Sequence, residues 1–214
     1  MKVLAPTLPP DLPVELHAKR LLLDSETLSD VSVRGQDLVG IKIKAASISE
    51  SRLEKVDASE AHLERLVVKD VVLENCSLVA VNFTDSGWRY VQVSESRCSG
   101  AQFQMSTLKD VVFKGCKLDL VNFRFAKLQN VLFQNCLLND TDFYNAELKN
   151  VVFDACAIEK VEFSAAKMEK VDLSSSELGI VRGIGSLKGA TVSSLQLVGL
   201  APYLAQEIGM VIKD

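Results

Sequence analysis

The sequence predicts an all-β solenoid, a chain wound into coils that have four short sides each. Three observations lead to this fold class. Apolar residues recur at alternating gaps of two and three, this period of five holds from Leu21 to about Leu178, and residue types repeat every twenty positions. An α-helix with 3.6 residues per turn and a strand of period two both lose phase with such a pattern. Four fives therefore make one coil, and each side contributes two inward side chains and a corner.

The two inward rows differ in residue size. The larger residue of each five runs in steps of five from Leu23, and only Ala58 and Cys98 are small there. It includes eight of the nine phenylalanines, namely Phe83, Phe103, Phe113, Phe123, Phe133, Phe143, Phe153 and Phe163. The residue two positions earlier is small or β-branched, as at Ala126 and Val131. Because one coil cannot bury its apolar residues alone, stacked coils must share a continuous core.

The fives AKLQN, CLLND, AELKN and AKMEK resemble those of the pentapeptide-repeat family, and the resemblance covers about three quarters of the chain. The family implies a right-handed quadrilateral β-helix with coils roughly 4.8 Å apart. About eight coils with a C-terminal helical cap would then give a rod on the order of 38 Å tall. The chain also has a distant similarity to the family members that inhibit topoisomerases and confer quinolone resistance.

The two ends of the chain depart from the repeat. We expect residues 1–20, with a cluster of prolines, to be an extended arm that shields the first coil edge. Residues 21–180 form the solenoid. Residues 181–214 are expected to hold a loop, short helices and a terminal strand that cap the last coil.

The C-terminal segment contains signals for a rung and for two helices. Residues 190–192 are expected to add a last rung, Ser193 or Ser194 to cap a helix, and Pro202 to start a second one. Leu204 and Ile208 would then pack on the final coil. Similar tails dimerise in several bacterial members of the family, so the segment is either a simple cap or a cap with a dimer contact. The residues expected to make this cap or dimer contact are Leu197, Leu200, Tyr203, Leu204 and Ile208.

Composition narrows the possible classes of protein. The net charge of −4 is too small for a general nucleic-acid binder, and weak for a mimic of a polyanion. No apolar run is long enough for a membrane span or a signal peptide, so we expect a cytoplasmic protein that does not bind membranes. The five cysteines have apolar register positions and lack the spacing of a disulfide framework or a zinc site.

The sequence carries no recognisable catalytic or cofactor-binding motif. Its two histidines, His17 and His62, have no partner at catalytic spacing. Stacked thiols at Cys116, Cys136 and Cys156 are expected to pack as small apolar side chains. We therefore predict no enzyme activity, no cofactor and no metal.

Outward positions with apolar residues are the candidate functional surface. A row of them recurs every twenty residues, and further apolar side chains stand where the pattern expects polar ones. The candidates for protein contact are Val72, Val112, Leu132, Val152, Leu120, Leu137 and Phe125. The first hypothesis is a non-enzymatic scaffold that binds a protein partner or a second copy. The alternative, implied by the resemblance, is a DNA mimic that inhibits or protects the type II topoisomerase DNA gyrase, although lysines on one face and the weak net charge depart from that pattern.

Overall fold

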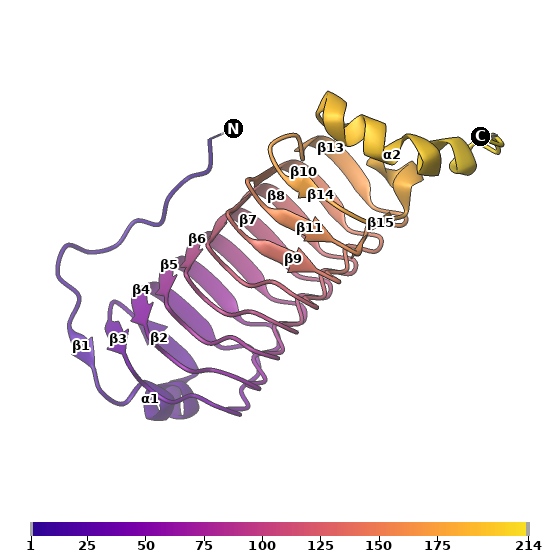
Figure 1. Ribbon diagram of the computed structural model, residues 1–214. Helices are drawn as coiled ribbons and strands as arrows, with labels where there is room; N and C mark the ends of the chain where they lie inside the picture. The colour runs from indigo at the N-terminus through magenta and orange to yellow at the C-terminus, as the bar shows by residue number, and fades with distance from the viewer. Residues whose placement is uncertain (1, 213–214) are drawn as a thin grey trace.

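The computed structural model is a rod of stacked coils and describes residues 2–212 (Figure 1). Met1 and residues 213–214, the outer ends of the predicted arm and C-terminal segment, lie outside the described residues. Long parallel strands, most of them bent at a corner, form one continuous wall that covers two sides of the rod. They are β4 (Ser47–Glu54), β5 (Val67–Glu74), β6 (Gly87–Ser94), β7 (Thr107–Lys114), β8 (Lys127–Gln134), β10 (Glu147–Asp154) and β13 (Lys167–Asp172). The predicted β-solenoid is confirmed.

Residues twenty positions apart pair along this wall. Thr27 pairs with Ser47, Ser47 with Val67, and the same step continues to the pair of Glu147 with Lys167. These pairs make eight levels in the part of the chain that the structure describes, and the pairs of Val14 with Ser32 and of Val171 with Ala190 continue the ladder at the two ends, so the stack is slightly taller than the predicted eight coils. Each level therefore places equivalent residues directly over one another.

Every coil has four sides, which we number from the start of each long strand. The long strand spans the first and second sides. The third side carries β9 (Leu137–Asn139), β11 (Ala157–Glu159) and β14 (Glu177–Leu178), and the fourth carries β12 (Val161–Glu162) and β15 (Val181–Arg182). Elsewhere on these two sides single parallel bridges hold the same step of twenty, as between Lys117 and Leu137.

Corners between the sides use the left-handed backbone conformation. In one coil Asn130, Asn135, Asp140 and Asn145 have φ angles of 54°, 52°, 50° and 54°. This conformation costs an L-residue roughly 1–2 kcal/mol, and Asn and Asp tolerate it best among residues with a side chain. A left-handed residue at every fifth position turns the chain, which explains why the sequence has a period of five.

Polar side chains at some inward positions satisfy carbonyl groups of the coil below. The Thr141 and Ser176 hydroxyls donate to the carbonyl oxygens of residues 118 and 153, both at 2.8 Å. The Cys136 thiol lies 3.4 Å from the carbonyl oxygen of residue 113 in the same way. Cys, Ser and Thr suit the small inward row, because their side chains pack in the core and can also donate a hydrogen bond to a backbone carbonyl group.

Two columns of stacked phenylalanines form the upper core. Phe103 and Phe123 stack with ring centres 5.2 Å apart, and Phe133 and Phe153 stack at 4.8 Å. Rings of different columns meet edge-on, as Phe123 and Phe133 do at 6.2 Å. Both arrangements are favourable for aromatic rings, so the stack combines buried area with preferred ring geometry.

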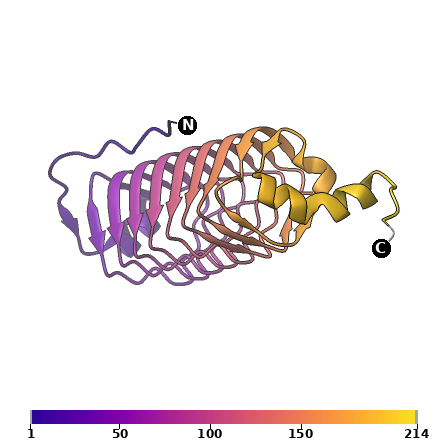
Figure 2. The same ribbon diagram turned by 45° about the horizontal axis from the view of Figure 1, so that its top comes forward.

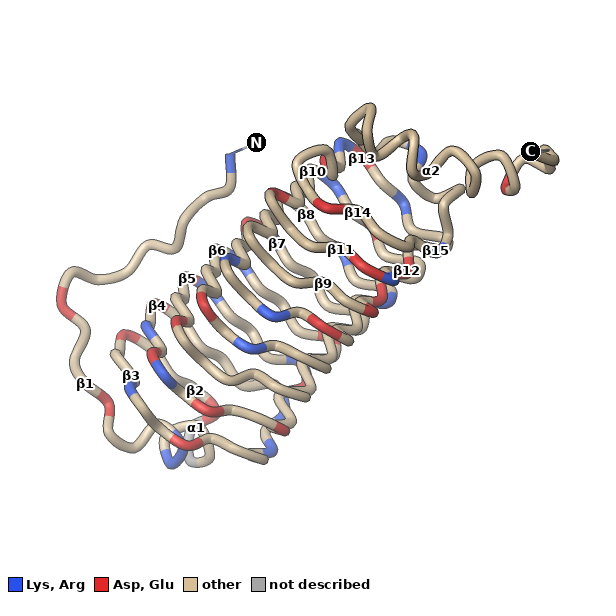
Figure 3. The backbone as a smooth tube through the Cα atoms, in the orientation of Figure 1, with Lys and Arg blue, Asp and Glu red and all other residues tan. Residues whose placement is uncertain are grey.

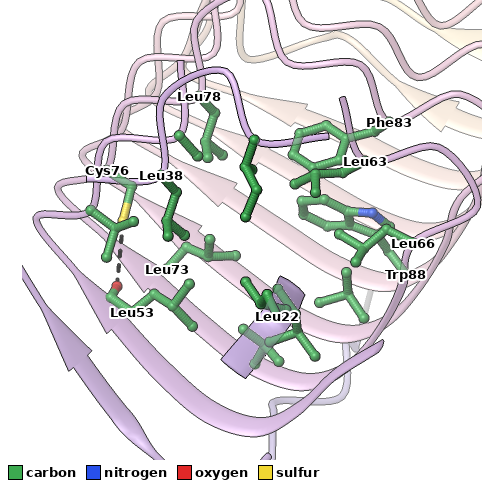
Figure 4. Close-up of a pocket in the computed structure, with 16 residues that line it drawn as sticks. Leu22, Leu38, Leu53, Leu63, Leu66, Leu73, Cys76, Leu78, Phe83 and Trp88 are labelled. Atoms are coloured by element: carbon green, nitrogen blue, oxygen red, sulfur yellow. Dashed lines mark hydrogen bonds between the residues drawn. The ribbon is translucent and has the colours of Figure 1, made fainter. Parts of the chain in front are cut away.

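The lower core is packed less well than the upper core. Leu, Ile and Ala replace phenylalanine below Phe83, and they enclose an apolar cavity of about 40 Å³ (Figure 4). Ala58 stands on its wall, between Leu38 and Leu78 of the same column. The Trp88 indole also borders it, and its Nε1 has no hydrogen-bond partner within the described residues. The small side chain of Ala58 thus borders empty apolar space in the core.

A helix covers the first coil, contrary to the predicted extended entry. Helix α1 (Ala18–Ser25) buries Ala18 and Leu22 against the core. Leu21 and Leu23, predicted to begin the inward rows, are 37% and 55% exposed because the helix turns them outward. The repeat therefore begins near Leu28, where β2 (Thr27–Ser29) pairs with β4. The edge of β3 (Ser32–Arg34) is paired by β1 (Val14–Glu15).

The last coil is closed by a rung, a 3₁₀ turn and one helix. Strand β16 (Ala190–Thr191) pairs with β13, as predicted, after the 3₁₀ helix η1 (Ile184–Leu187). Helix α2 (Ser194–Glu207) begins at the predicted cap Ser193, which forms a capping box with Gln196. The prediction of two helices is wrong, because α2 runs through Pro202 without a break.

We predict that Ala58→Val stabilises the fold. Two added methyl groups would fill apolar space that is now empty, and cavity filling typically adds about 1 kcal/mol to the free energy of unfolding. Thermal denaturation followed by circular dichroism should show a higher Tm. Ala146→Val is the matched control, because Ala146 is equally buried but does not border the cavity. It should lower stability by about 1–3 kcal/mol through overpacking. A lower Tm for Ala58→Val than for the wild-type chain would contradict the prediction.

Candidate protein-contact surfaces

The predicted apolar row lies on the second side of the coils, in register from β5 to β10. It contains Val72, Val112, Leu132 and Val152, with Gln92 between the first two. Val72 is only 9% exposed, and the other three valine and leucine side chains are half-buried. The row is therefore partly covered and not an open stripe.

The N-terminal arm runs along part of the rod from β1 (Figure 1), and its contacts at β5 and β7 place it beside this row. The Leu4 backbone N–H donates to Asp110 Oδ1 at 3.3 Å, and the Thr7 backbone N–H donates to Asp70 Oδ1 at 2.9 Å. These aspartates occupy the corner between the first and second sides and are only 2% and 8% exposed. Sequence reasoning missed both, because Asp is an ordinary corner residue and only the fold brings the arm to them.

The corner column continues past the arm as a ladder of side-chain amides. Asn130 Nδ2 donates to Asp110 Oδ1 at 3.1 Å, and Asn150 Nδ2 donates to Asn130 Oδ1 at 3.1 Å. Beyond it lies an open cleft of about 520 Å³. The cleft is lined by Lys2, Asn130, Asn150, Val152, Lys170, Val171, Asp172 and Thr191. Lys2 of the arm thus reaches only its near end.

The other predicted contact residues do not join the row. Leu120 is 63% exposed at the corner of the third and fourth sides, and Leu137 is 40% exposed on the third side. Phe125 is 47% exposed at the corner that follows the fourth side. It meets the ring of Tyr144 edge-on at 5.8 Å, and the Arg124 guanidinium lies 4.6 Å from the Tyr144 ring centre. These side chains are exposed but spread over three parts of the perimeter.

Both signs of charge are spread along the rod (Figure 3), and several charged side chains pair between neighbouring levels. Lys149 Nζ lies 3.0 Å from Glu169 Oε2, and Arg34 Nη2 lies 3.0 Å from Glu54 Oε1. The first side even carries an excess of cations in one column, at Lys69, Arg89, Lys109 and Lys149. The third side carries Asp57, whose pKa is lowered by hydrogen bonds from the Ser59 hydroxyl and backbone N–H. No side therefore carries a continuous acidic column among the described residues.

The five cysteines are free and buried. Burial raises the pKa of the Cys76 thiol, and hydrogen bonding to Cys116 together with burial raises the pKa of Cys98. Hydrogen bonds with the thiols of Cys116 and Cys156 raise the pKa of Cys136. All five thiols are at most 3% exposed, and a thiol that a reagent cannot reach is a poor nucleophile.

Helix α2 divides the predicted cap and dimer residues into two groups. Leu200 is 5% exposed and Leu204 is half-buried, and the Gln196 side chain donates to the carbonyl oxygens of residues 173 and 176 at 2.8 and 2.7 Å. Leu197 and Tyr203 are each half exposed. The expectation that Ile208 packs on the final coil is wrong. It is 73% exposed because the end of α2 projects past the coil (Figure 2).

The exposed side chains of α2 extend into the segment after it. We call this surface the tail face. It consists of Leu195, Leu197, Val198, Tyr203, Ile208, Met210, Val211 and Ile212, and each of these side chains is at least 50% exposed. Surfaces of this kind on a folded domain commonly mark a contact site.

Comparisons with known proteins agree with the geometry. Residues 97–163 match the family described as pentapeptide repeat region. Residues 97–163 thus resemble a pentapeptide repeat region, and they lie within the solenoid. Comparison with the curated protein sequences gave no match.

One solved structure supports the fold, and a second is a weaker match. A trypsin-treated form of QnrB1, a plasmid-mediated fluoroquinolone resistance protein, is 20% identical with a TM-score of 0.50, over 87% of this chain and 90% of that one. HetL, a pentapeptide repeat protein involved in heterocyst differentiation regulation from Nostoc sp. strain PCC 7120, is 15% identical with a TM-score of 0.34, over 85% and 98%. At 20% identity the likeness to QnrB1 concerns the fold alone.

Residues 2–212 contain no group of three or more His, Cys, Asp or Glu side chains arranged to hold a metal ion. No helix within this range is long and apolar enough to cross a membrane.

We predict that the thiols are inert in the folded protein. At pH 8, 5,5′-dithiobis(2-nitrobenzoic acid) should react at least about a hundredfold more slowly with the native chain than with the chain in guanidinium chloride, because the folded coils keep the reagent away from the buried thiols. The denatured sample is the control and should release five thiols per chain. Rapid modification of any cysteine in the native protein would contradict this.

Proposed function

We propose that this protein is a non-enzymatic scaffold that acts through protein–protein contact and that associates with a second copy of itself through the tail face. The observation that supports self-association most directly is the set of exposed apolar side chains on α2 and the segment after it. Burying such side chains contributes roughly 25 cal/mol per Å² of apolar surface.

The way α2 is attached makes it suitable for this role. Its first turns are fixed to the last coil by Gln196 and Leu200, while Tyr203 and Ile208 remain exposed farther along. A helix held at one end presents its apolar residues in a defined orientation, which lowers the entropy lost on association. A twofold pair would bury the same face of both copies, and the two rods would then point away from each other.

Inhibition of a type II topoisomerase such as DNA gyrase is the second candidate. It is suggested by the fold shared with the fluoroquinolone resistance protein QnrB1. A DNA mimic needs a continuous acidic surface, and the matched charges and the cation column described above do not supply one. The scaffold function is therefore the better supported of the two.

We predict that Leu197→Glu with Ile208→Glu prevents self-association. Charged side chains would have to be buried without partners, so the dissociation constant of the pair should rise at least about tenfold. Analytical ultracentrifugation over a range of concentrations would measure it. Met105→Glu is the matched control, because Met105 is 57% exposed and belongs to no candidate contact surface. A wild-type chain that stays monomeric at high concentration would refute self-association.

We also expect no effect on gyrase. In a DNA supercoiling assay, micromolar protein should leave the activity unchanged, with and without a fluoroquinolone. A known DNA-mimic inhibitor serves as the positive control. Inhibition or protection by the wild-type chain would make the topoisomerase function the better reading.

A further inference from the structure

We propose that the corner column beside the apolar row is a binding seat for an extended, proline-containing peptide of a partner protein, and that the N-terminal arm is a competitor built into the chain. We define the seat by Asp70, Asp110, Val72 and Val112. It is separate from the tail face, so this inference can fail or hold independently of self-association.

The spacing of the seat matches an extended peptide. Asp70 and Asp110 are two levels apart on the same corner, which is about 9.6 Å at the usual strand spacing. Leu4 and Thr7 are three residues apart, and three residues of a polyproline II helix rise about 9.3 Å. That helix also has three residues per turn, so every third N–H points the same way. A peptide along the rod therefore presents one N–H to every second level.

The seat offers two carboxylate groups as hydrogen-bond acceptors, with apolar side chains beside them. Both aspartates are almost fully buried, and each accepts an arm N–H. Hydrogen bonds to a charged acceptor are stronger than those between neutral groups. The adjoining Val72 and Val112 add apolar surface beside the two aspartates, Val72 being 9% exposed and Val112 half-buried. This combination selects an extended chain with free N–H groups three residues apart.

The seat extends beyond the part that the arm uses. Two levels above Asp110 the same corner carries Asn150, and the 520 Å³ cleft lies beside it with Val152 in its lining. Lys2 is the arm residue that lines this cleft. A partner peptide that continues in the same direction would also contact Asn150 and the other side chains that line the cleft.

This extra length explains how a partner could displace the arm. A tethered segment competes at an effective concentration in the millimolar range, so a partner with identical contacts would lose. A longer peptide makes contacts that the arm lacks and can therefore win. The arm would then limit binding to partners that fill the cleft as well as the seat.

The test uses the full chain and a fluorescent peptide copy of residues 2–13. In the variant Leu4→Pro with Thr7→Pro, the arm loses the two N–H donors and should leave the seat. Fluorescence anisotropy should then show peptide binding at least about tenfold tighter than to the wild-type chain, whose own arm competes. The control Leu4→Ala with Thr7→Ala keeps both N–H groups and should behave as the wild type does.

A second set of variants tests the seat itself. Asp70→Ala with Asp110→Ala, placed in the double-proline variant, should weaken the peptide at least about tenfold. Glu60→Gln, at an exposed corner elsewhere, is the matched control, and thermal denaturation confirms folding of each variant. Equal binding to the aspartate variant, or no binding to the double-proline variant, would overturn the proposal. A wild-type dimer that the free peptide dissociates would also overturn it, in favour of arm exchange between two copies.

Discussion

Backbone hydrogen bonding between one coil and the next is the interaction on which this structure depends. It pairs residues twenty positions apart, so every side chain stands above an equivalent one. The stacked phenylalanines, the amide ladder of Asn130 and Asn150 and the matched ion pairs all follow from that step. The left-handed residue at each corner makes the step possible, because it returns the chain to its starting position after four sides.

Stacking also leaves two ends and a wall that the repeat itself cannot protect. Helix α1 covers the first coil and α2 covers the last, and both use a few buried side chains, such as Leu22 and Leu200, to dock on the core. The arm covers part of the wall with backbone hydrogen bonds to two aspartates. The non-repeating segments therefore differ in how firmly they are held, and the arm and the end of α2 are the least embedded.

The candidate functional contacts lie in the segments that are held least firmly, the arm and the end of α2. Repeated residues form the core and the ladders, where substitution mainly changes stability. The contacts proposed above use instead the exposed end of α2 and the corner beneath the arm. A rod of this kind offers partners a rigid surface with a fixed vertical spacing, and an extended peptide can match that spacing. The interaction surfaces are thus set by the segments outside the repeat together with the columns they lie against.

The sequence by itself determined the solenoid, because an inward pair such as Phe133 and Val131 recurs every five residues and only a four-sided coil keeps that period in phase. It also indicated a helix cap at Ser193 or Ser194 and the last rung at residues 190–192. Tertiary structure decided what local patterns leave open. Residues 18–25 became a helix although Leu21 and Leu23 continue the period, since the first coil needs a cover. Asp70 and Asp110 became acceptors for the arm because folding brings together residues more than sixty positions apart, a contact that no local pattern records.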